Sequence, residues 1–228
     1  MIAALYVARG GCYYGLSDVD PWDEQRDARL YDGPHAVVSH PPCSRWCRLA
    51  GLVEARWGHK RGADGGCFAA ALSSVRKWGG VLEHPAYSSA WRHHGLLAPP
   101  FTGGWVRADW GGGWTCHVEQ GHYGHRARKA TWLYAVGCSL PSLTWGPSAK
   151  RMRLDSVYHS AEERHRMTRP PAGMDSESRA ARREWLAEHA KQTGKEWLCA
   201  ERMNKTERAA TPLPFRDLLL DMARSVSR

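Results

Sequence analysis

The sequence predicts an α/β protein with a single Rossmann-like mixed sheet, mostly parallel with one antiparallel strand, and a small C-terminal helical extension. Short apolar runs alternate with an amphipathic helical segment, which is typical of parallel strand–helix–strand units. Glycine or proline lies close to the end of each run, where the chain has to turn. With 228 residues, 43% of them hydrophobic, the chain can build one core and a minor appendage.

The first half of the chain supplies the predicted parallel strands. Residues 4–8 and 36–39 form short apolar runs, and apolar residues recur at helical spacing over 64–78 before a Gly-Gly pair. A further strand over 80–83 completes a right-handed unit with parallel strands. Because ligands of such sheets bind at the carboxyl ends of the strands, we expect the residues after 36–39 and at the end of 80–83 on one rim.

The second half is predicted to be less regular. Residues 95–122 are rich in Gly, Pro and Trp, which indicates loops or a short hairpin with exposed aromatic side chains. The clearest strand covers 131–136, and its basic lead-in faces the rim only if this strand runs antiparallel to the others. Helices are expected over about 175–192 and after Pro212, where an apolar face should pack back on the sheet.

Composition limits the environment and the partners of the protein. The formal charge of +9 favours a polyanionic partner. No apolar run approaches the ~20 residues of a membrane helix, and residues 1–16 do not read as a secretory leader. We therefore expect no membrane association and a cytoplasmic location, in which the seven cysteines are free thiols.

Two reactive side chains follow or end predicted strands. Cys43 comes directly after a Pro-Pro pair that holds it on a rigid loop, where Arg45 and a following helix are expected to lower the pKa of its thiol. Glu83 ends an apolar strand, and a buried carboxylate needs either a partner or a raised pKa, both of which suit proton donation. A buried structural cysteine and a surface carboxylate are the alternatives. The pattern predicts a nucleophile at Cys43 and an acid at Glu83.

The order of these motifs resembles that of the DNA (cytosine-5) methyltransferases. Pro-Pro-Cys matches the catalytic cysteine of that family at Cys43, and Glu-His-Pro matches its Glu-Asn motif at Glu83, with His84 in place of asparagine. The resemblance implies that the Cys43 thiolate adds to C6 of a cytosine flipped out of DNA while Glu83 protonates or hydrogen-bonds N3. It is greatest to the compact enzymes of phages and prophages.

A third segment extends the resemblance. Before the strand at 131–136, Ala127, Lys129 and Thr131 stand where the family has Gln, Arg and Arg. The resemblance implies that Lys129 reaches the base and is a third catalytic residue. The likeness is specific over 39–47, 81–85 and 122–137. The residues that it places against the substrate are Pro42, Ser44, Arg45, His84, Arg128 and Thr131.

The resemblance also implies S-adenosylmethionine as the methyl donor. Members of the family begin with a Phe-x-Gly-x-Gly-Gly loop, of which residues 6–16 are a compressed relative. Only a short connection leads from this loop to the Cys43 strand, so a strand–helix unit of the family is missing. The expected cofactor contacts are Gly10, Gly11, Gly15, Asp20 and Trp22.

On this interpretation the chain has three parts. Residues 1–138 form the catalytic core, 139–205 form a basic loop and helical insert that is a candidate for DNA contact, and 206–228 form a helix that packs on the core. One alternative is a related enzyme that modifies pyrimidines with another donor or acts on a free nucleotide. Others are an inactive binding relative and a zinc-stabilised DNA-binding module, whose ligands would come from Cys43, Cys47, Cys116, His117, His122 and His125.

Overall fold

The computed structural model describes residues 1–150, 152, 154, 179–194 and 203–227. These residues belong to two compact units. The first unit consists of Met1–His125, Lys129–Ala149 and Thr211–Arg228, and the second of Arg126–Arg128 and Lys150–Ala210. All three residues predicted to be catalytic lie in the first unit.

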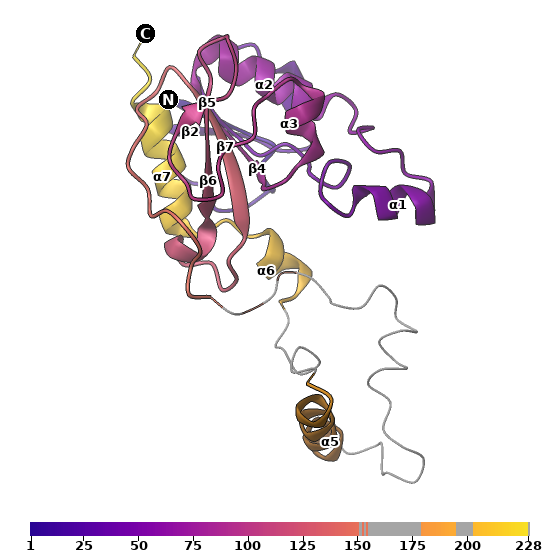
Figure 1. Cartoon of the computed structure of the whole chain (residues 1–228). Coiled ribbons are helices and arrows are strands. Elements are labelled where there is room, and N and C mark those ends of the chain that lie inside the picture. Colours follow the sequence, from indigo (N-terminus) through magenta and orange to yellow (C-terminus); the bar gives the residue numbers. More distant parts are fainter. Residues whose placement is uncertain (151, 153, 155–178, 195–202, 228) are drawn as a thin grey trace. The chain divides into compact units, whose positions relative to one another are not determined.

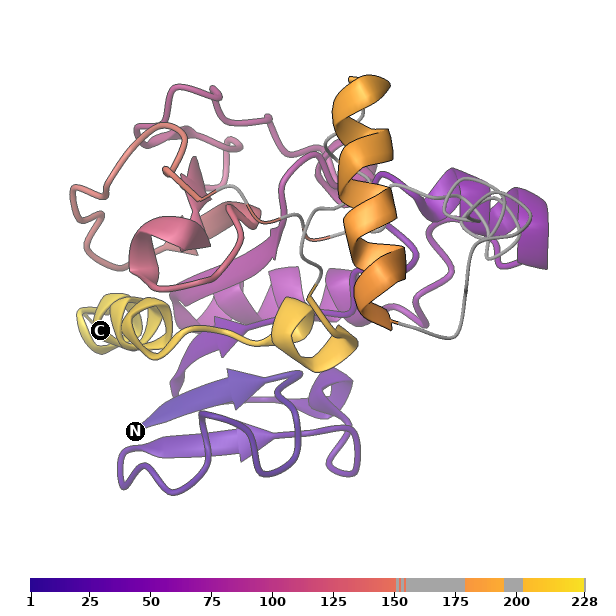
Figure 2. The same cartoon turned by 90° about the horizontal axis from the view of Figure 1, so that it is seen from below.

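A mixed sheet of seven strands forms the centre of the first unit, in the order β2-β1-β3-β4-β7-β6-β5 (Figure 1). The strands are β1 Ile2–Leu5, β2 Val19–Trp22, β3 Ala36–Ser39, β4 Gly80–Pro85, β5 Val106–Arg107, β6 Trp114–Glu119 and β7 Ala130–Val136. The first four are parallel to one another, as their arrows show in Figure 2. β7 is antiparallel to both β4 and β6, and β5 is antiparallel to β6.

Several predicted strands are confirmed and others need correction. β3, β4 and β7 lie where the sequence places them, and β7 is antiparallel to β4 as expected. The first strand covers Ile2–Leu5 instead of 4–8, because Tyr6 adopts a φ of 60° and leaves the strand. The prediction of a single antiparallel strand is wrong, because β5, which forms a hairpin with β6, also runs opposite to the four parallel strands.

Helices cover both faces of the sheet (Figure 1). α7, Leu213–Arg224, packs against β1, β3 and β4, which confirms that the last helix returns to the sheet. α2, Cys67–Trp78, covers the other face and ends at Gly79. Because side chains alternate along a strand, Val81 lies in the core under α7 and Leu82 in the core under α2.

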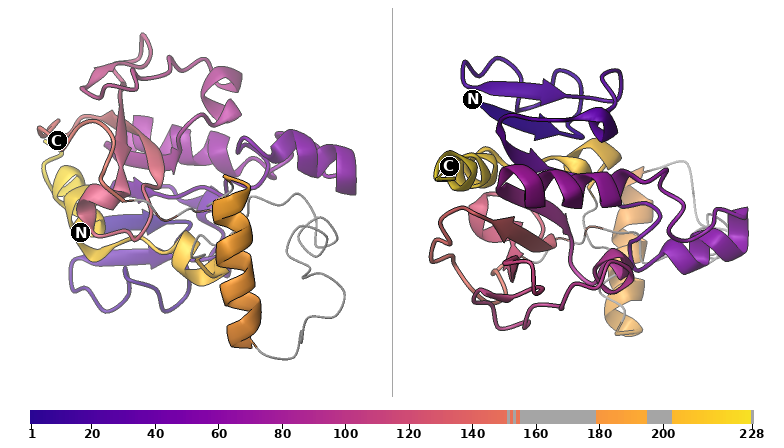
Figure 3. Two further views of the ribbon diagram at one scale, coloured as in Figure 1. Left: turned by 60° about the horizontal axis from the view of Figure 1, so that its bottom comes forward. Right: turned by 90° about the horizontal axis from the view of Figure 1, so that it is seen from above.

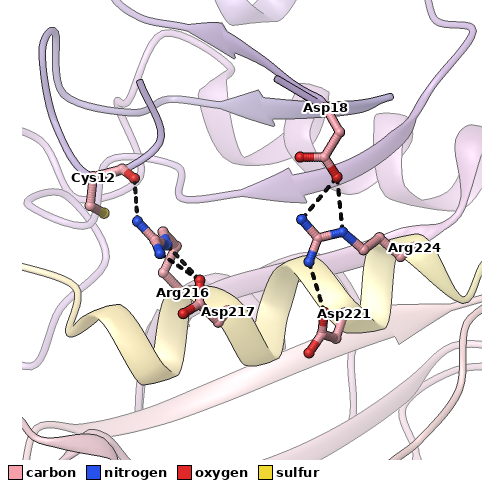
Figure 4. A network of polar contacts seen from close by, with 6 residues as sticks. All are labelled: Cys12, Asp18, Arg216, Asp217, Asp221 and Arg224. Atoms are coloured by element: carbon pink, nitrogen blue, oxygen red, sulfur yellow. Dashed lines mark hydrogen bonds and ion pairs between the residues drawn. The ribbon is translucent and has the colours of Figure 1, made fainter. Parts of the chain in front are cut away.

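Two arginines of α7 hold the loop that joins β1 to β2 (Figure 4). Arg216 donates from Nη1 to the backbone oxygen of Cys12 at 2.8 Å. Arg224 pairs with Asp18 at the other end of the loop, at 2.8 Å, and with Asp221 of its own helix. The loop that was predicted to bind a cofactor is therefore fixed from the C-terminal helix.

The remaining helices are shorter or belong to the second unit. In the first unit they are α1 Ala50–Trp57, which was not predicted, α3 Ser89–His93, and the 3-10 turns η1 Ala28–Leu30 and η2 Gln120–Tyr123. The second unit contains α5 Arg179–Gln192 and α6 Lys205–Ala209. α5 ends where the sequence predicts, whereas its expected start near 175 lies outside the described residues. Among the helices in the described ranges, none is long and apolar enough to cross a membrane.

Candidate active site

The strand order places the candidate site at the carboxyl ends of β1 and β3. The chain passes from β1 to β2 on one side and then returns to β3 on the other, so the order reverses between β1 and β3. In open α/β sheets ligands bind outside the carboxyl ends of the strands at such a reversal. The glycine-containing loop leaves β1 here, and Cys43 follows β3 closely.

A chain of hydrogen bonds crosses this rim. The hydroxyl group of Tyr13 lies 2.8 Å from Nε2 of His40, and Nδ1 of His40 lies 3.1 Å from Oε2 of Glu83. Oε1 of Glu83 accepts a hydrogen bond from Nε2 of Gln120 at 3.0 Å. The same amide donates to Oγ1 of Thr131 at 3.0 Å. Both carboxylate oxygens of Glu83 therefore have partners from other segments of the fold.

The surroundings of Glu83 keep it ionised. Burial alone would raise its pKa, but the hydrogen bond and charge of His40, together with the charge of Lys129, outweigh burial and lower the pKa to about 2. A buried carboxylate that accepts hydrogen bonds is stabilised in its charged form. From the sequence, a buried Glu83 was expected to have either a bonding partner or a raised pKa. The structure gives it partners, and its pKa is lowered. A proton that Glu83 passes to a substrate must first reach it from a neighbouring group.

Cys43 lies on the same rim, in a turn in which its carbonyl oxygen accepts from the amides of Trp46 and Cys47, both at 2.9 Å. Burial, together with the charges of Cys47 and Glu83, raises the pKa of its thiol to about 11, although Lys129 opposes them. The expectation of a lowered pKa is therefore wrong. The physical reason is that the turn half-buries the sulfur beside a carboxylate.

Lys129 brings a positive charge to the rim from the residue before β7. Its backbone φ is 44°, a conformation that is uncommon for a residue with a Cβ. Burial lowers the pKa of its ammonium group, while Glu83, Cys43 and Cys12 favour the charged form. The three residues predicted to be catalytic are thus close enough for their charges to interact.

Other residues expected at the substrate are placed differently. His84 follows Glu83 on β4, so its side chain points to the α2 face and packs against Phe68, at 5.2 Å between ring centroids. Burial lowers the pKa of His84 to about 4. Thr131 is fully buried within the hydrogen-bond chain. Arg128 belongs to the second unit, where its Nε donates to the backbone oxygen of Lys150.

The other three lie on the Cys43 turn itself. Pro42 and Ser44 are exposed beside Cys43. Arg45 is half-buried, and its backbone oxygen accepts from the amide of Gly62 at 3.0 Å. This turn can therefore present Pro42 and Ser44 to a large substrate.

The glycines of the first loop fit a cofactor loop by position. Gly10 and Gly15 have φ values of 65° and 77°, and a Cβ at either would meet no heavy atom within 4 Å. Such residues turn the chain and leave its backbone open to a ligand. At Gly11 a Cβ would lie 2.9 Å from the oxygen of Ala8 in the same turn, so the turn itself requires that glycine.

Asp20 and Trp22 fit a nucleoside only in part. The Asp20 carboxylate accepts from Nε1 of Trp22 at 2.8 Å and forms an ion pair with Arg26, whose guanidinium lies 4.0 Å from the centre of the Trp22 ring. The ion pair is partly exposed and so contributes little to stability. Asp20 can hold a ribose after it exchanges Arg26 for the sugar hydroxyls.

The residues of the zinc interpretation are not brought together. Cys116 and His117 are neighbours on β6, so Cys116 lies in the core under α7 while His117 accepts from Trp132 in the core under α2. Within the ranges that the structure describes, no group of three or more His, Cys, Asp or Glu side chains could hold a metal ion. This finding contradicts a site built from that set.

Three members of the site were not predicted from the sequence. Tyr13 lies in the glycine loop, His40 directly precedes the Pro-Pro pair, and Gln120 follows β6. His40 had a usable signal, because a titratable residue at the end of a buried parallel strand is placed at the ligand-binding rim.

Comparisons with protein-family models, curated proteins and solved structures gave no match.

Proposed function

We propose that this chain modifies cytosine in DNA at C5, with Cys43 as the nucleophile and Glu83 as the group that engages N3, on a Rossmann-like sheet. The observation that carries the proposal is the meeting of Cys43, Glu83 and Lys129 at the reversal of strand order. Their order in the chain, with Pro-Pro before the cysteine and proline soon after the glutamate, resembles the DNA (cytosine-5) methyltransferases.

Cys43 has to release its thiol proton to water as the cytosine binds. A thiol with a pKa of about 11 is almost entirely protonated at neutral pH, and the thiolate is the nucleophile. Lys129 supplies a half-buried positive charge that stabilises the thiolate once it forms. Entry of the base displaces water from the rim and strengthens this attraction. The Cys43 sulfur then forms a bond with C6 of the cytosine.

Glu83 engages the cytosine ring at N3. Its carboxylate accepts a hydrogen bond from the exocyclic amino group of cytosine and holds the proton that N3 gains as sulfur adds to C6. Addition at C6 makes C5 nucleophilic. S-adenosylmethionine, when bound, supplies the methyl group that C5 takes up. Water then takes up the C5 proton, Cys43 departs as the thiolate, and the aromatic ring is restored.

A basic and aromatic segment beside Cys43 supports DNA as the substrate. Residues 45–61 contain five Lys and Arg side chains and a single carboxylate, Glu54. Trp57 is 57% exposed on α1, with the Arg56 guanidinium 5.1 Å from the centre of its ring. Figure 3 shows α1 extending away from the sheet. Cations bind phosphates and exposed aromatic rings stack on unpaired bases, which offsets the cost of flipping a base.

Mass spectrometry of nucleosides tests this function. Cytosine-containing DNA is incubated with the protein and S-adenosylmethionine, digested, and compared with the same reaction without donor. We expect 5-methylcytosine with the wild type and none with Cys43→Ser. Unmodified DNA in every reaction, with folded protein that forms no Cys43 complex with DNA, would contradict the proposal.

A second candidate uses the same site with another one-carbon donor or a free pyrimidine nucleotide. The observation that favours it is the Asp20–Arg26 ion pair, which occupies the carboxylate expected at the donor ribose. Parallel reactions with DNA and with deoxycytidine monophosphate distinguish the substrates. A mass change on the nucleotide with none on DNA would favour this candidate.

A further inference from the structure

We propose that His40 and Tyr13 are positioning residues for Glu83: His40 delivers the proton that Glu83 holds at N3 of the base, and Tyr13 fixes the imidazole for this transfer. The inference rests on the proposed function and deepens it, because it assigns the source of a proton that the reaction needs. The contacts that carry it are the hydrogen bonds of His40 to both partners.

Both nitrogens of the His40 ring are engaged by residues from other segments. Nε2 lies 2.8 Å from the Tyr13 hydroxyl, and Nδ1 lies 3.1 Å from Glu83. The side chains of His40 and Glu83 are only 14% and 13% exposed. The backbone amide of His40 also donates to the oxygen of Leu5 at 3.0 Å, which ties the residue to β1. The imidazole is thus held in one orientation.

The hydroxyl group of Tyr13 serves the imidazole and not the substrate. Tyr13 is 3% exposed, and its ring packs against His40 at 5.4 Å between centroids. A tyrosine hydroxyl can donate to a neutral imidazole or accept from a charged one. When Tyr13 donates to Nε2, the ring proton must stand on Nδ1, which faces Glu83. Tyr13 therefore aims the transferable proton at the carboxylate in either charge state.

Glu83 needs such a source because it is ionised in the folded protein. Its other hydrogen-bond donor in the chain across the rim is Gln120, whose amide does not titrate. The charged and titratable groups around the pair are Cys43, His84 and Lys129 at Glu83, Cys12 in the Tyr13 loop, and Arg216 and Asp217 on α7. Of the residues bonded directly to Glu83 in that chain, His40 is the one that can give up a proton.

The transfer balances in protons and needs no further reactant. The imidazolium form of His40 gives its Nδ1 proton to Glu83, and Glu83 gives a proton to N3 as the Cys43 sulfur bonds to C6. His40 is left neutral with its remaining proton on Nε2, from which it donates to the Tyr13 hydroxyl. When the sulfur departs, N3 returns the proton through Glu83 to His40.

The test compares His40→Asn with the wild type, because asparagine can keep a donor toward Glu83 but cannot titrate. We expect cytosine modification to slow by roughly 100-fold, the lower end of what positioned proton transfer contributes, and the pH dependence to flatten. DNA that contains 5-azacytosine provides a second readout, because its electron-poor ring depends less on protonation at N3. Formation of the Cys43 complex with that DNA should fall by less than about threefold.

Two further variants complete the experiment. Tyr13→Phe should also slow cytosine modification, while the 5-azacytosine complex still forms. This variant provides the test if His40→Asn does not fold. His35→Asn is the matched control, since His35 precedes the other end of β3. An equal loss with both kinds of DNA, or an unchanged pH profile in His40→Asn, would overturn the inference. A wild type that forms no Cys43 product or complex would instead reject the proposed function, and the inference with it.

Discussion

The His40–Glu83 pair should stabilise the fold at neutral pH and lose this contribution in acid. The pKa of Glu83 falls from 4.5 to about 2 in the folded protein. Since one pKa unit corresponds to about 1.4 kcal/mol, the ionised carboxylate contributes about 3 kcal/mol. Because the folded-state pKa is the lower one, the contribution is complete above the unfolded pKa and is lost as the pH falls toward the folded value. About 2 kcal/mol should be lost by about pH 3.

Urea unfolding, followed by tryptophan fluorescence, measures this loss at about pH 6 and about pH 3. Wild type and Glu83→Gln share all their other carboxyl groups, so the contributions of those groups cancel in the comparison. The wild type should lose about 2 kcal/mol more free energy of unfolding between the two pH values than Glu83→Gln does. Glutamine keeps the shape and an acceptor oxygen for Gln120.

A third protein separates the cause. His40 supplies the strongest influence that lowers the pKa of Glu83, so in the His40→Asn background the same Glu83→Gln comparison should give a smaller difference. Equal losses in the wild type and Glu83→Gln would refute the reasoning, since Glu83 would then bind its proton equally in the folded and unfolded chains. That result would also remove the reason why Glu83 needs His40 as its proton source.

Five further substitutions test other parts of the molecule. Cys43→Ser should abolish cytosine modification while Cys47→Ser keeps a substantial fraction, measured by nucleoside mass spectrometry, and equal loss in both would count against a single nucleophile. Gly80→Ala should cost roughly 3 kcal/mol or more of unfolding free energy, because its Cβ would overlap the backbone of β3 at a φ of 116°. Gly10→Ala, with a φ of 65° but open space, should cost only about 1 kcal/mol. Arg56→Ala should weaken DNA binding and reduce the slope of log affinity against log salt by about 1, and an unchanged slope would exclude a phosphate contact there.

The sequence by itself determined the elements whose signals are local. β3 and β4 could be predicted because glycine and proline bound short apolar runs, and α2 because its buried side chains repeat at helical spacing. The shared rim of Cys43 and Glu83 followed from the rule that parallel strands of one sheet end at one edge. β7 could be oriented because its basic lead-in had to reach that rim.

Only the tertiary structure decided what depends on partners distant in the chain. The hydrogen bond between His40 and Glu83 joins residues 43 positions apart, and no local pattern encodes it. The pKa of the Cys43 thiol was predicted in the wrong direction, because burial and the approach of Glu83 are properties of the assembled rim. Because side chains alternate along β4, His84 lies on the opposite face of the sheet from Glu83, although the two are neighbours in sequence. Electrostatics and burial depend on all the groups that folding brings together, whereas strand and helix signals are read from adjacent residues.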